Sequence, residues 1–241
     1  LTAINSINWA RLIAQAVYYF WTYAQLRCNK INFVVPSGNF RNIFSARIAK
    51  YMGLPIDKLY LVTNANDILH RSITSGDMNK KNVQKTYSPS MDIQVSSNFE
   101  RQIFESVRRD SDALKNIMES FTKKGFHMLS EEVILDLQSI YHSHSVSNDQ
   151  TLATIKKFKN NYNYIADPHT ATGLYVLDQE KNNCPIVSLA CAHPAKFGDA
   201  IEKAIGEKPI FPDQLKNVFD KKENFTILDN NIEDIKQYIL N

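Results

Sequence analysis

Short apolar runs alternate along the chain with segments in which apolar residues recur every three or four positions. The runs at residues 31–35, and those starting at Lys58 and Cys184, are nearly continuous in apolar residues, which is typical of buried parallel strands. Residues 7–26 instead place apolar side chains at helical spacing: Ile7, Leu12, Ala16, Tyr19, Tyr23 and Leu26. This alternation predicts an α/β fold in which helices flank an open, twisted, mostly parallel sheet.

Two capping boxes mark predicted helix starts. Ser97 is followed by Glu100 and Ser147 by Gln150, the spacing at which a side chain and a backbone N–H cap each other reciprocally. We therefore predict that a helix begins after each of these two serines.

Several segments lack any sign of chemistry. Residues 111–124 and 130–141 are predicted helices, and residues 77–92 show no periodicity and are predicted to form a loop. His142 and His144 lie in a Ser-rich polar stretch, which we also interpret as a loop without a functional role.

Polar turns follow three of the predicted strands, at residues 37–42, 63–67 and 191–193. In a parallel sheet the carboxyl ends of the strands share one edge, and ligands bind beyond that edge. We therefore expect the three turns to lie at the same edge of the sheet.

The turn at residues 36–42 has the chemistry of an anion site. Ser37, Gly38 and Asn39 precede a predicted helix, whose first N–H groups are unpaired and carry partial positive charge. A phosphate satisfies both, and Gly38 permits a close approach of the backbone. Arg41 in the first helical turn costs ~0.3–1 kcal/mol unless an anion is bound. The alternative is a plain helix cap with Arg41 in solvent.

Composition excludes several classes of protein. The chain has 241 residues, 44% of them hydrophobic, and a net charge of +3, which is too small to indicate nucleic-acid binding. Its three cysteines show no metal spacing and favour a reducing cytosol over a disulfide scaffold. The first stretch carries too many polar residues for a signal peptide or a membrane span. We therefore expect a cytoplasmic globular protein.

Six stretches, taken together and in order, resemble threonine synthase, a pyridoxal-phosphate (PLP) enzyme that converts O-phosphohomoserine and water to threonine and inorganic phosphate. They are NSINWARLIAQAVYYF (5–20), VPSGNF (35–40), TNANDILHR (63–71), SPSMDIQVSSNFER (88–101), DPHTATG (167–173) and AHPAKF (192–197). The resemblance implies a fold-type II PLP enzyme, of which this chain is the larger, carboxyl-terminal portion. The first residue, Leu1 rather than Met, agrees with a piece of a longer protein.

The resemblance also implies a domain organisation. Residues 1–206 are expected to form the large PLP-binding α/β portion, and residues 207–241 short tail elements packed on it. The amino-terminal portion of the enzyme is expected to be absent.

The resemblance assigns a cofactor site. The residues implied to bind the phosphate of PLP are Gly38, Asn39, Phe40, Arg41 and Asn42. Cys191 stands where the family commonly has a threonine whose hydroxyl meets the ring nitrogen, and a thiol is a weaker hydrogen-bonding group. Arg41 stands where the family usually has glycine, so its side chain either adds a charge-assisted contact to phosphate or distorts the pocket.

A polar cluster at the head of the first helix is a candidate substrate site. Its members are Asn5, Ser6, Asn8 and Arg11, donors of the kind that a substrate phosphate requires. Helix capping with one solvated arginine is an equal alternative.

Other polar residues have two interpretations, a place in the cleft or a purely structural role. They are Asp67, His70, Arg71, Asn98, Arg101, His169 and His193. The histidines have no neighbouring ligand residues at the spacing of a metal site, so a metal site is not expected.

The catalytic group of such an enzyme is missing from this sequence. PLP enzymes of this kind need a Schiff-base lysine, which the family carries in its amino-terminal portion, and Lys196 matches a different family position. The chain alone is therefore predicted to be inactive, and the full-length protein to be a PLP-dependent carbon–oxygen lyase of threonine biosynthesis. The alternatives are a related PLP-dependent phospholyase and a catalytically retired, threonine synthase-like binding module. The expected partner is a small-molecule substrate, with no nucleic acid and no membrane, and the oligomeric state is open.

Overall fold

The computed structural model describes residues 5, 7–181, 183–215, 217–218 and 220–240. The chain divides into two compact units, Leu1–Pro209 and Ile210–Asn241. Each unit is described by itself below.

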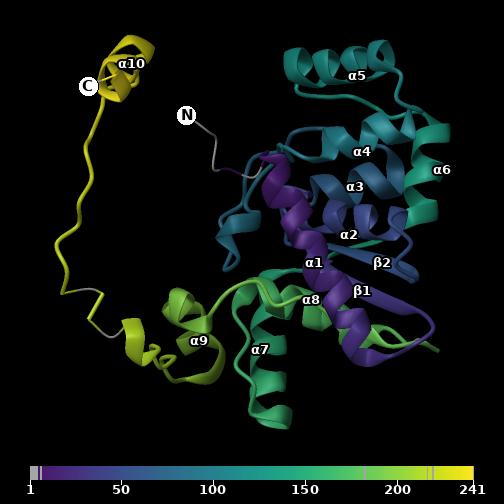
Figure 1. The fold of residues 1–241 in the computed structure, drawn as a ribbon. Helices are drawn as coiled ribbons and strands as arrows, with labels where there is room; N and C mark the ends of the chain where they lie inside the picture. The colour runs from purple at the N-terminus through teal and green to yellow at the C-terminus, as the bar shows by residue number, and fades with distance from the viewer. Residues whose placement is uncertain (1–4, 6, 182, 216, 219, 241) are drawn as a thin grey trace. The chain divides into compact units, whose positions relative to one another are not determined.

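The first unit is built on a four-stranded sheet (Figure 1). Its strands are β1 (Ile31–Pro36), β2 (Ile56–Thr63), β3 (Tyr141–Ser145) and β4 (Ile186–Ser188), in the order β3-β2-β1-β4. All three pairings are parallel, with Val35 opposite Leu61 between β1 and β2, and Phe33 opposite Val187 between β1 and β4. The predicted α/β fold with a parallel sheet is confirmed.

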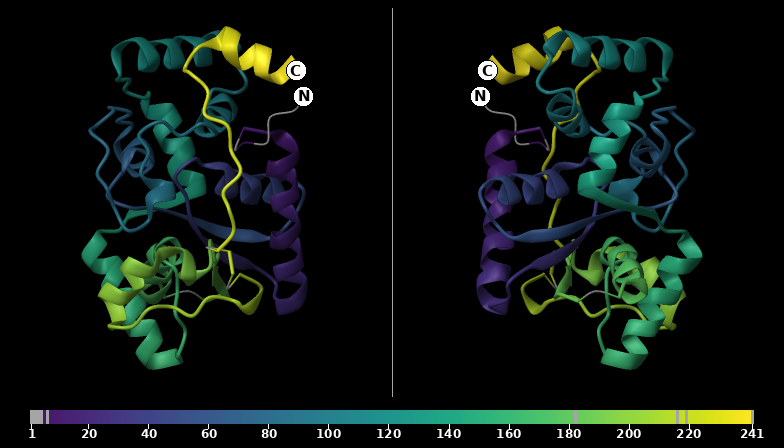
Figure 2. Two further views of the ribbon diagram at one scale, coloured as in Figure 1. Left: turned by 90° about the vertical axis from the view of Figure 1, so that its left-hand side faces the viewer. Right: turned by 90° about the vertical axis from the view of Figure 1, so that its right-hand side faces the viewer.

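Strand β1 is buried along its whole length, because helices cover both faces of the sheet. Phe33 and Val35 pack into the core shared with α1 (Trp9–Leu26), α2 (Arg41–Tyr51) and α3 (Ile68–Ser75). Val34 points the other way and packs in a smaller core with Val176 of α8 (Pro168–Gln179). The two layers of helices are visible on opposite sides of the sheet in Figure 2.

The remaining helices extend these layers. They are α4 (Phe99–Ser106), α5 (Ser111–Lys124), α6 (Glu131–Ile140), α7 (Asn148–Tyr162) and α9 (Gly198–Ile205), with short 3-10 turns η1 (Pro89–Met91) and η2 (Pro194–Phe197). In the part of the chain that the structure describes, no helix combines the length and the apolar character that a membrane crossing needs.

One of the two predicted capping boxes forms. Ser147 and Gln150 cap each other at the start of α7, as predicted. The prediction of a capping box at Ser97 was wrong, because α4 begins after Asn98 and its N-cap makes no side-chain hydrogen bond. The Asn98 side chain instead donates to the Asn39 carbonyl, so a tertiary contact has replaced the local cap.

The prediction of a loop at His142 and His144 was also wrong. These residues belong to β3, an edge strand paired with β2 from Leu59 opposite Tyr141 to Thr63 opposite Ser145. An edge strand has one neighbour and can remain half-exposed, so this one lacks the apolar run that marks a central strand. The ring of Tyr60 packs against both imidazoles, at 5.3 Å from His142 and 6.1 Å from His144 between centroids.

The second unit contains η3 (Asp213–Leu215) and the terminal helix α10 (Ile232–Leu240). Ile232, Ile235 and Ile239 form an apolar stripe at helical spacing along α10, and all three are exposed. The expected packing of residues 207–241 on the larger portion stays a prediction.

Candidate functional site

A cavity of about 420 Å³ lies beyond the carboxyl ends of β1 and β4. From β1 the chain moves outward through β2 to β3, and then returns to place β4 on the other side of β1. The cavity therefore occupies the point where the strand order reverses, where open α/β sheets bind their ligands. Its lining residues are Gln15, Tyr18, Thr22, Pro36, Ser37, Gly38, Asn39, Arg41, Asn42, Ser90, Met91, His169, Leu189, Ala190 and Cys191.

The turn after β1 forms one wall. Ser37 still donates its N–H to the carbonyl of Val62 in the sheet, at 2.8 Å. Phe40 then adopts a left-handed conformation (φ 62°), held by its fully buried ring, which packs 5.0 Å from the ring of Phe99. No acceptor within the described residues pairs with the backbone N–H groups of Gly38, Asn39 or Phe40. The turn thus presents unpaired donors at the start of α2.

Asn98 holds this turn from outside. Its backbone N–H and its Nδ2 both donate to the Asn39 carbonyl, each at 3.1 Å. Arg101 donates to Asn98 Oδ1 at 3.3 Å and to the Ile7 carbonyl at 2.9 Å. Asn98 and Arg101, whose roles the sequence leaves open, therefore have structural roles beside the turn.

Gly38 is required for close packing of the opposite wall. A Cβ at this position would lie 2.9 Å from Met91 Cα and 3.1 Å from the Ser90 carbonyl oxygen. The sequence predicts a close approach of the backbone at Gly38, and in this structure the segment that approaches is η1.

Helix α1 supplies a third wall through Gln15, Tyr18 and Thr22. The hydroxyls of Tyr18 and Tyr19 both donate to Asn42 Oδ1, Tyr19 at 2.8 Å. Burial raises the pKa of both tyrosines well above the ordinary value, so both hydroxyls stay protonated and can donate. Because Oδ1 already accepts both hydroxyls, Asn42 can offer a ligand its Nδ2 amino group, which is a donor.

Arg41 is the one positively charged side chain among the described lining residues, and no carboxylate lines the cavity with it. Its Nε donates to Gln15 Oε1 at 3.1 Å. Partial burial lowers the pKa of Arg41, and the positive charge of Arg11 lowers it further. An arginine still stays protonated, so the cavity has a positive wall.

A buried carboxylate organises the last wall. Asp167 is 1% exposed and accepts hydrogen bonds from His169 N–H at 2.9 Å, His169 Nδ1 at 3.0 Å, Ala192 N–H at 3.1 Å and the Thr170 hydroxyl. Burial raises its pKa, but the hydrogen bonds from His169 and Thr170 outweigh burial and lower it overall. His169 Nε2 accepts the Ser90 N–H at 3.1 Å, which joins this wall to η1.

Cys191 is fixed by the same network. Its N–H donates to Thr170 Oγ1 at 2.8 Å, and its thiol lies 3.7 Å from the Leu189 carbonyl. The residue is exposed to the open cavity, yet the protein packed around the sulfur raises the thiol pKa, and the negative charge of Asp167 raises it further. The exposure tempers the burial effect without changing its direction, so Cys191 presents a neutral thiol to the cavity.

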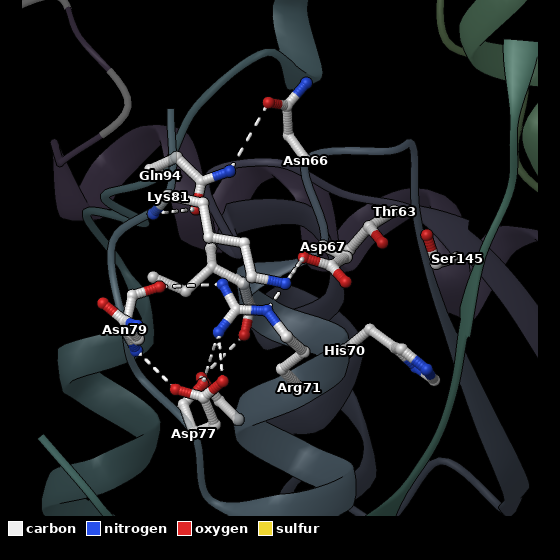
Figure 3. A network of polar contacts seen from close by, with 12 residues as sticks. Thr63, Asn66, Asp67, His70, Arg71, Asp77, Asn79, Lys81, Gln94 and Ser145 are labelled. Carbon is white, nitrogen blue, oxygen red and sulfur yellow. Dashed lines mark hydrogen bonds and ion pairs between the residues drawn. The ribbon is translucent and has the colours of Figure 1, made fainter. Parts of the chain in front are cut away.

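The turn after β2 does not line the cavity but holds the loop that does (Figure 3). Arg71, 11% exposed in its side chain, donates to Asp67 at 2.9 Å and to Asp77 at 2.5 Å. Burial alone would lower the pKa of Arg71, but the hydrogen bonds with Asp67 and Asp77 raise it. Arg71 therefore has a structural role, since it anchors the start of the 77–92 loop.

Asparagines after β2 fix the far end of the loop. The Nδ2 groups of Asn64 and Asn66 donate to Asp92 Oδ1 at 2.8 and 3.0 Å. Asn66 also pairs with both backbone groups of Gln84, each at 2.9 Å. These contacts set the position of η1 against Gly38.

The structure brings together most of the residues implied to bind the cofactor. Gly38, Asn39, Arg41, Asn42 and Cys191 line the same cavity. Phe40 contributes its backbone to the turn, while its ring is buried in the core. The assignment of these residues to a cofactor stays a proposal.

The four candidate substrate residues are not among the described lining residues. Asn8 caps α1 by accepting the Ala10 N–H at 2.9 Å, and Asn5 accepts the Ile7 N–H at 3.0 Å. Ser6 lies outside the described residues. Arg11 is close enough for its charge to act on Arg41.

Sequence reasoning missed Gln15, Tyr18 and Thr22 as site residues. They follow one another by three and four positions and so share one face of α1, and they are polar on a helix that is otherwise mostly apolar. The two candidate histidines have different places. His169 lines the cavity, whereas His193 accepts the Ala195 N–H at 3.2 Å and caps η2.

Comparison with known proteins gives a consistent result. Residues 170–239 match the family model described as "Threonine synthase, C-terminal". Threonine synthase of Pseudomonas aeruginosa is 38% identical over 99% of this chain and 52% of its own length. The crystal structure of PLP-bound threonine synthase from Brucella melitensis superimposes with a TM-score of 0.92 at 41% identity, over 99% of this chain and 52% of that one. Yeast threonine synthase superimposes with a TM-score of 0.88 at 36% identity, over 99% and 53%.

The chain spans about half the length of the curated relatives it matches. Its sequence and its fold agree over almost all of its own length with those relatives. The chain belongs to the threonine synthase family.

Proposed function

We propose that this chain is the cofactor-binding part of a PLP-dependent threonine synthase, a carbon–oxygen lyase of threonine biosynthesis that converts O-phosphohomoserine and water to threonine and phosphate. Support comes from the family and from the PLP-bound relative at 41% identity. The related phospholyase and the retired binding module are less favoured, since the first six curated relatives are all called threonine synthase. Three free cysteines fit a cytosolic protein.

The residues present fit a phosphate-bearing cofactor. The Oγ of Ser37 is buried and has no hydrogen-bond partner among the described residues, although Ser37 lines the cavity. The unpaired N–H groups of Gly38, Asn39 and Phe40 follow it directly, at a helix start without an acidic residue. Unpaired donors that converge on the wall of a cavity favour an acceptor there, and a phosphate supplies several. These orphaned donors are the observation that carries the proposal.

Each wall then has a defined task. The turn and Asn42 would bind the phosphate, and Tyr18 and Tyr19 would orient Asn42. The neutral thiol of Cys191 would face the ring nitrogen, where it holds no charge that could force protonation of the ring. When bound, PLP supplies the electron sink that stabilises carbanions of the amino-acid substrate.

The chain lacks a candidate for the covalent link to PLP within the cavity. No lysine is among the described lining residues, and Lys196 lies in η2, beside a different hollow. The lysine is therefore expected from the part of the enzyme that this chain does not span, and the chain alone is expected to be inactive.

The test is to compare this chain with a protein extended to the length of its relatives. The extended protein is expected to be yellow with PLP and to release phosphate from O-phosphohomoserine, while the 241-residue chain releases none. An extended protein that folds but stays colourless and inactive would contradict the proposal.

A further inference from the structure

We propose that Arg41 is the residue by which this cavity selects a phosphate monoester dianion, with its two Nη groups donating to the phosphate oxygens. The inference rests on the proposed function, since it concerns the same cavity. It adds a specific side-chain contact to a site whose other donors come mainly from the backbone.

The first support is the hydrogen bonding of the guanidinium. Gln15 accepts from Nε at 3.1 Å, which fixes one edge of the planar group. The two Nη groups have no partner within the described part of the chain, and Arg41 forms no ion pair there. A guanidinium held by one edge offers its remaining donors in the fork geometry that matches phosphate.

The second support is the charge around Arg41. No carboxylate lines the cavity among the described residues, and the nearby buried one, Asp167, is already occupied by its own hydrogen bonds. The positive charge of Arg11 acts on Arg41 and lowers its pKa, as a charge of the same sign does. A cation at the wall of a cavity that no described carboxylate lines favours an anionic ligand.

The third support is the start of α2. A stable helix usually begins with a capping side chain at its N-cap and acidic residues in its first turn. The N-cap of α2 is Phe40, which cannot cap, and its first turn has no acidic residue; Asn39 Oδ1 accepts only the Arg41 N–H, at 3.0 Å. Helix α2 instead has a left-handed Phe40 and a cation at its first position. A dianion between the unpaired N–H groups and Arg41 would satisfy the helix and the arginine together.

The fourth support is the buried Ser37 hydroxyl. Ser37 is 4% exposed and its Oγ has no partner among the described residues. This is a polar group independent of the helix terminus, and it lies at the same wall of the cavity as Arg41. The two observations point to the same ligand chemistry.

The test measures ligand affinity rather than activity. Dissociation constants of the 241-residue chain are measured by calorimetry for inorganic phosphate, PLP and pyridoxal, which lacks the phosphate. Arg41→Gln is expected to weaken phosphate and PLP about tenfold, the loss of one charge-assisted contact, and to leave pyridoxal unchanged. Arg41→Lys keeps the charge but lacks the forked geometry of the guanidinium. Its affinities for phosphate and PLP are expected to lie between those of the original chain and those of Arg41→Gln.

Arg47→Gln is the matched control. Arg47 is a half-buried arginine on the same helix, bonded to Tyr51 at 2.8 Å, and it is not among the lining residues. It is expected to leave all three affinities unchanged. An equal loss from Arg47→Gln would show a general charge effect and overturn the inference.

A second titration separates the two sources of phosphate. With PLP saturating, O-phosphohomoserine and homoserine are compared in the original chain and in Arg41→Gln. If Arg41→Gln weakens only the binding of O-phosphohomoserine, Arg41 contacts the phosphate of the substrate. If it weakens only the binding of PLP, Arg41 contacts the phosphate of the cofactor.

Two negative outcomes are distinguishable. If Arg41→Gln binds all phosphates as the original chain does, while PLP still binds at least tenfold tighter than pyridoxal, the inference about Arg41 is overturned and the proposed cofactor site stands. If the original chain does not distinguish PLP from pyridoxal, the proposed phosphate site itself is wrong.

Discussion

Gly38 shows how closely the walls of the cavity depend on single residues. Its missing side chain lets η1 pack against the turn after β1, with Met91 Cα only 2.9 Å from where a Cβ would stand. The obstacle is backbone, which cannot rotate away as a flexible side chain would.

Gly38→Ala is therefore expected to lower the free energy of unfolding by about 1–3 kcal/mol, as overpacking does. The measurement is urea denaturation. Gly198→Ala is the matched control, since nothing lies within 4 Å of its Cβ position and its backbone is helical (φ −50°). Equal stability of the two variants would mean that η1 does not press on Gly38.

Much at the residue scale was predictable from local chemistry, and the rest was not. Ser37, Gly38 and Asn39 before a helix indicate an anion site because the sequence itself brings the donors together. The clamp on Asn42 comes from tyrosines 23 and 24 positions away, and no local pattern indicates such a pairing.

At the scale of elements, the loop at residues 77–92 has no regular structure of its own beyond η1. It is held at one end by Arg71 with Asp67 and Asp77, and at the other by Asn64 and Asn66 with Asp92. The shape of this wall therefore depends on polar contacts with the turn after β2.

Arg71→Gln is expected to destabilise the chain by about 1–3 kcal/mol, because two half-buried carboxylates, Asp67 and Asp77, lose their hydrogen bonds to the guanidinium. It should also make the loop more sensitive to limited proteolysis. Arg109→Gln breaks the exposed pair with Glu105 and is expected to leave the urea midpoint and the cleavage rate nearly unchanged. The idea fails if both variants are cleaved at the same rate.

Histidines in the edge strand β3, and His70 beside it, make the stability of the fold depend on pH. Burial lowers the pKa of His70, His142 and His144 below the usual 6.5; the carboxylate of Glu180 acts in the opposite direction on His142 and His144, and that of Asp67 on His70. A lowered folded-state pKa means that the unfolded chain binds protons first as the pH falls. This contribution to stability is complete above pH about 6.5 and is lost as the pH falls from there through the folded-state pKa values.

Urea denaturation between pH 8 and pH 5 measures this loss. Replacing His142 and His144 by glutamine is expected to flatten the dependence. A double variant with the same slope as the original chain would assign the slope to other groups.

Sequence periodicity predicted most helices and the central strands because their apolar residues face a core on a fixed repeat. It failed at β3, whose place is set by pairing with β2 rather than by its own residues. The capping-box motif failed at Ser97, where a contact between Asn98 and Asn39, 59 positions apart, replaced the local cap.

At the scale of the whole first unit, one sheet with a reversal in strand order places the site. The reversal leaves space between the turns after β1 and β4, and helices α1 and α8 close that space from the two faces. The order of strands was not predictable from composition or spacing, since it depends on which side of β1 the last strand joins.

Because the cavity draws on segments from Gln15 to Cys191, a bound molecule connects the first helix of the unit to its last strand. Such a ligand binds only the fully assembled form, so melting of the entire unit becomes a reporter of occupancy. At a hundred times the dissociation constant, PLP adds about 2.7 kcal/mol to the free energy of unfolding, which for a unit of this size raises the Tm by about 5–11 °C. Screening by thermal shift would thus identify ligands for this chain even though it is not expected to turn over a substrate by itself.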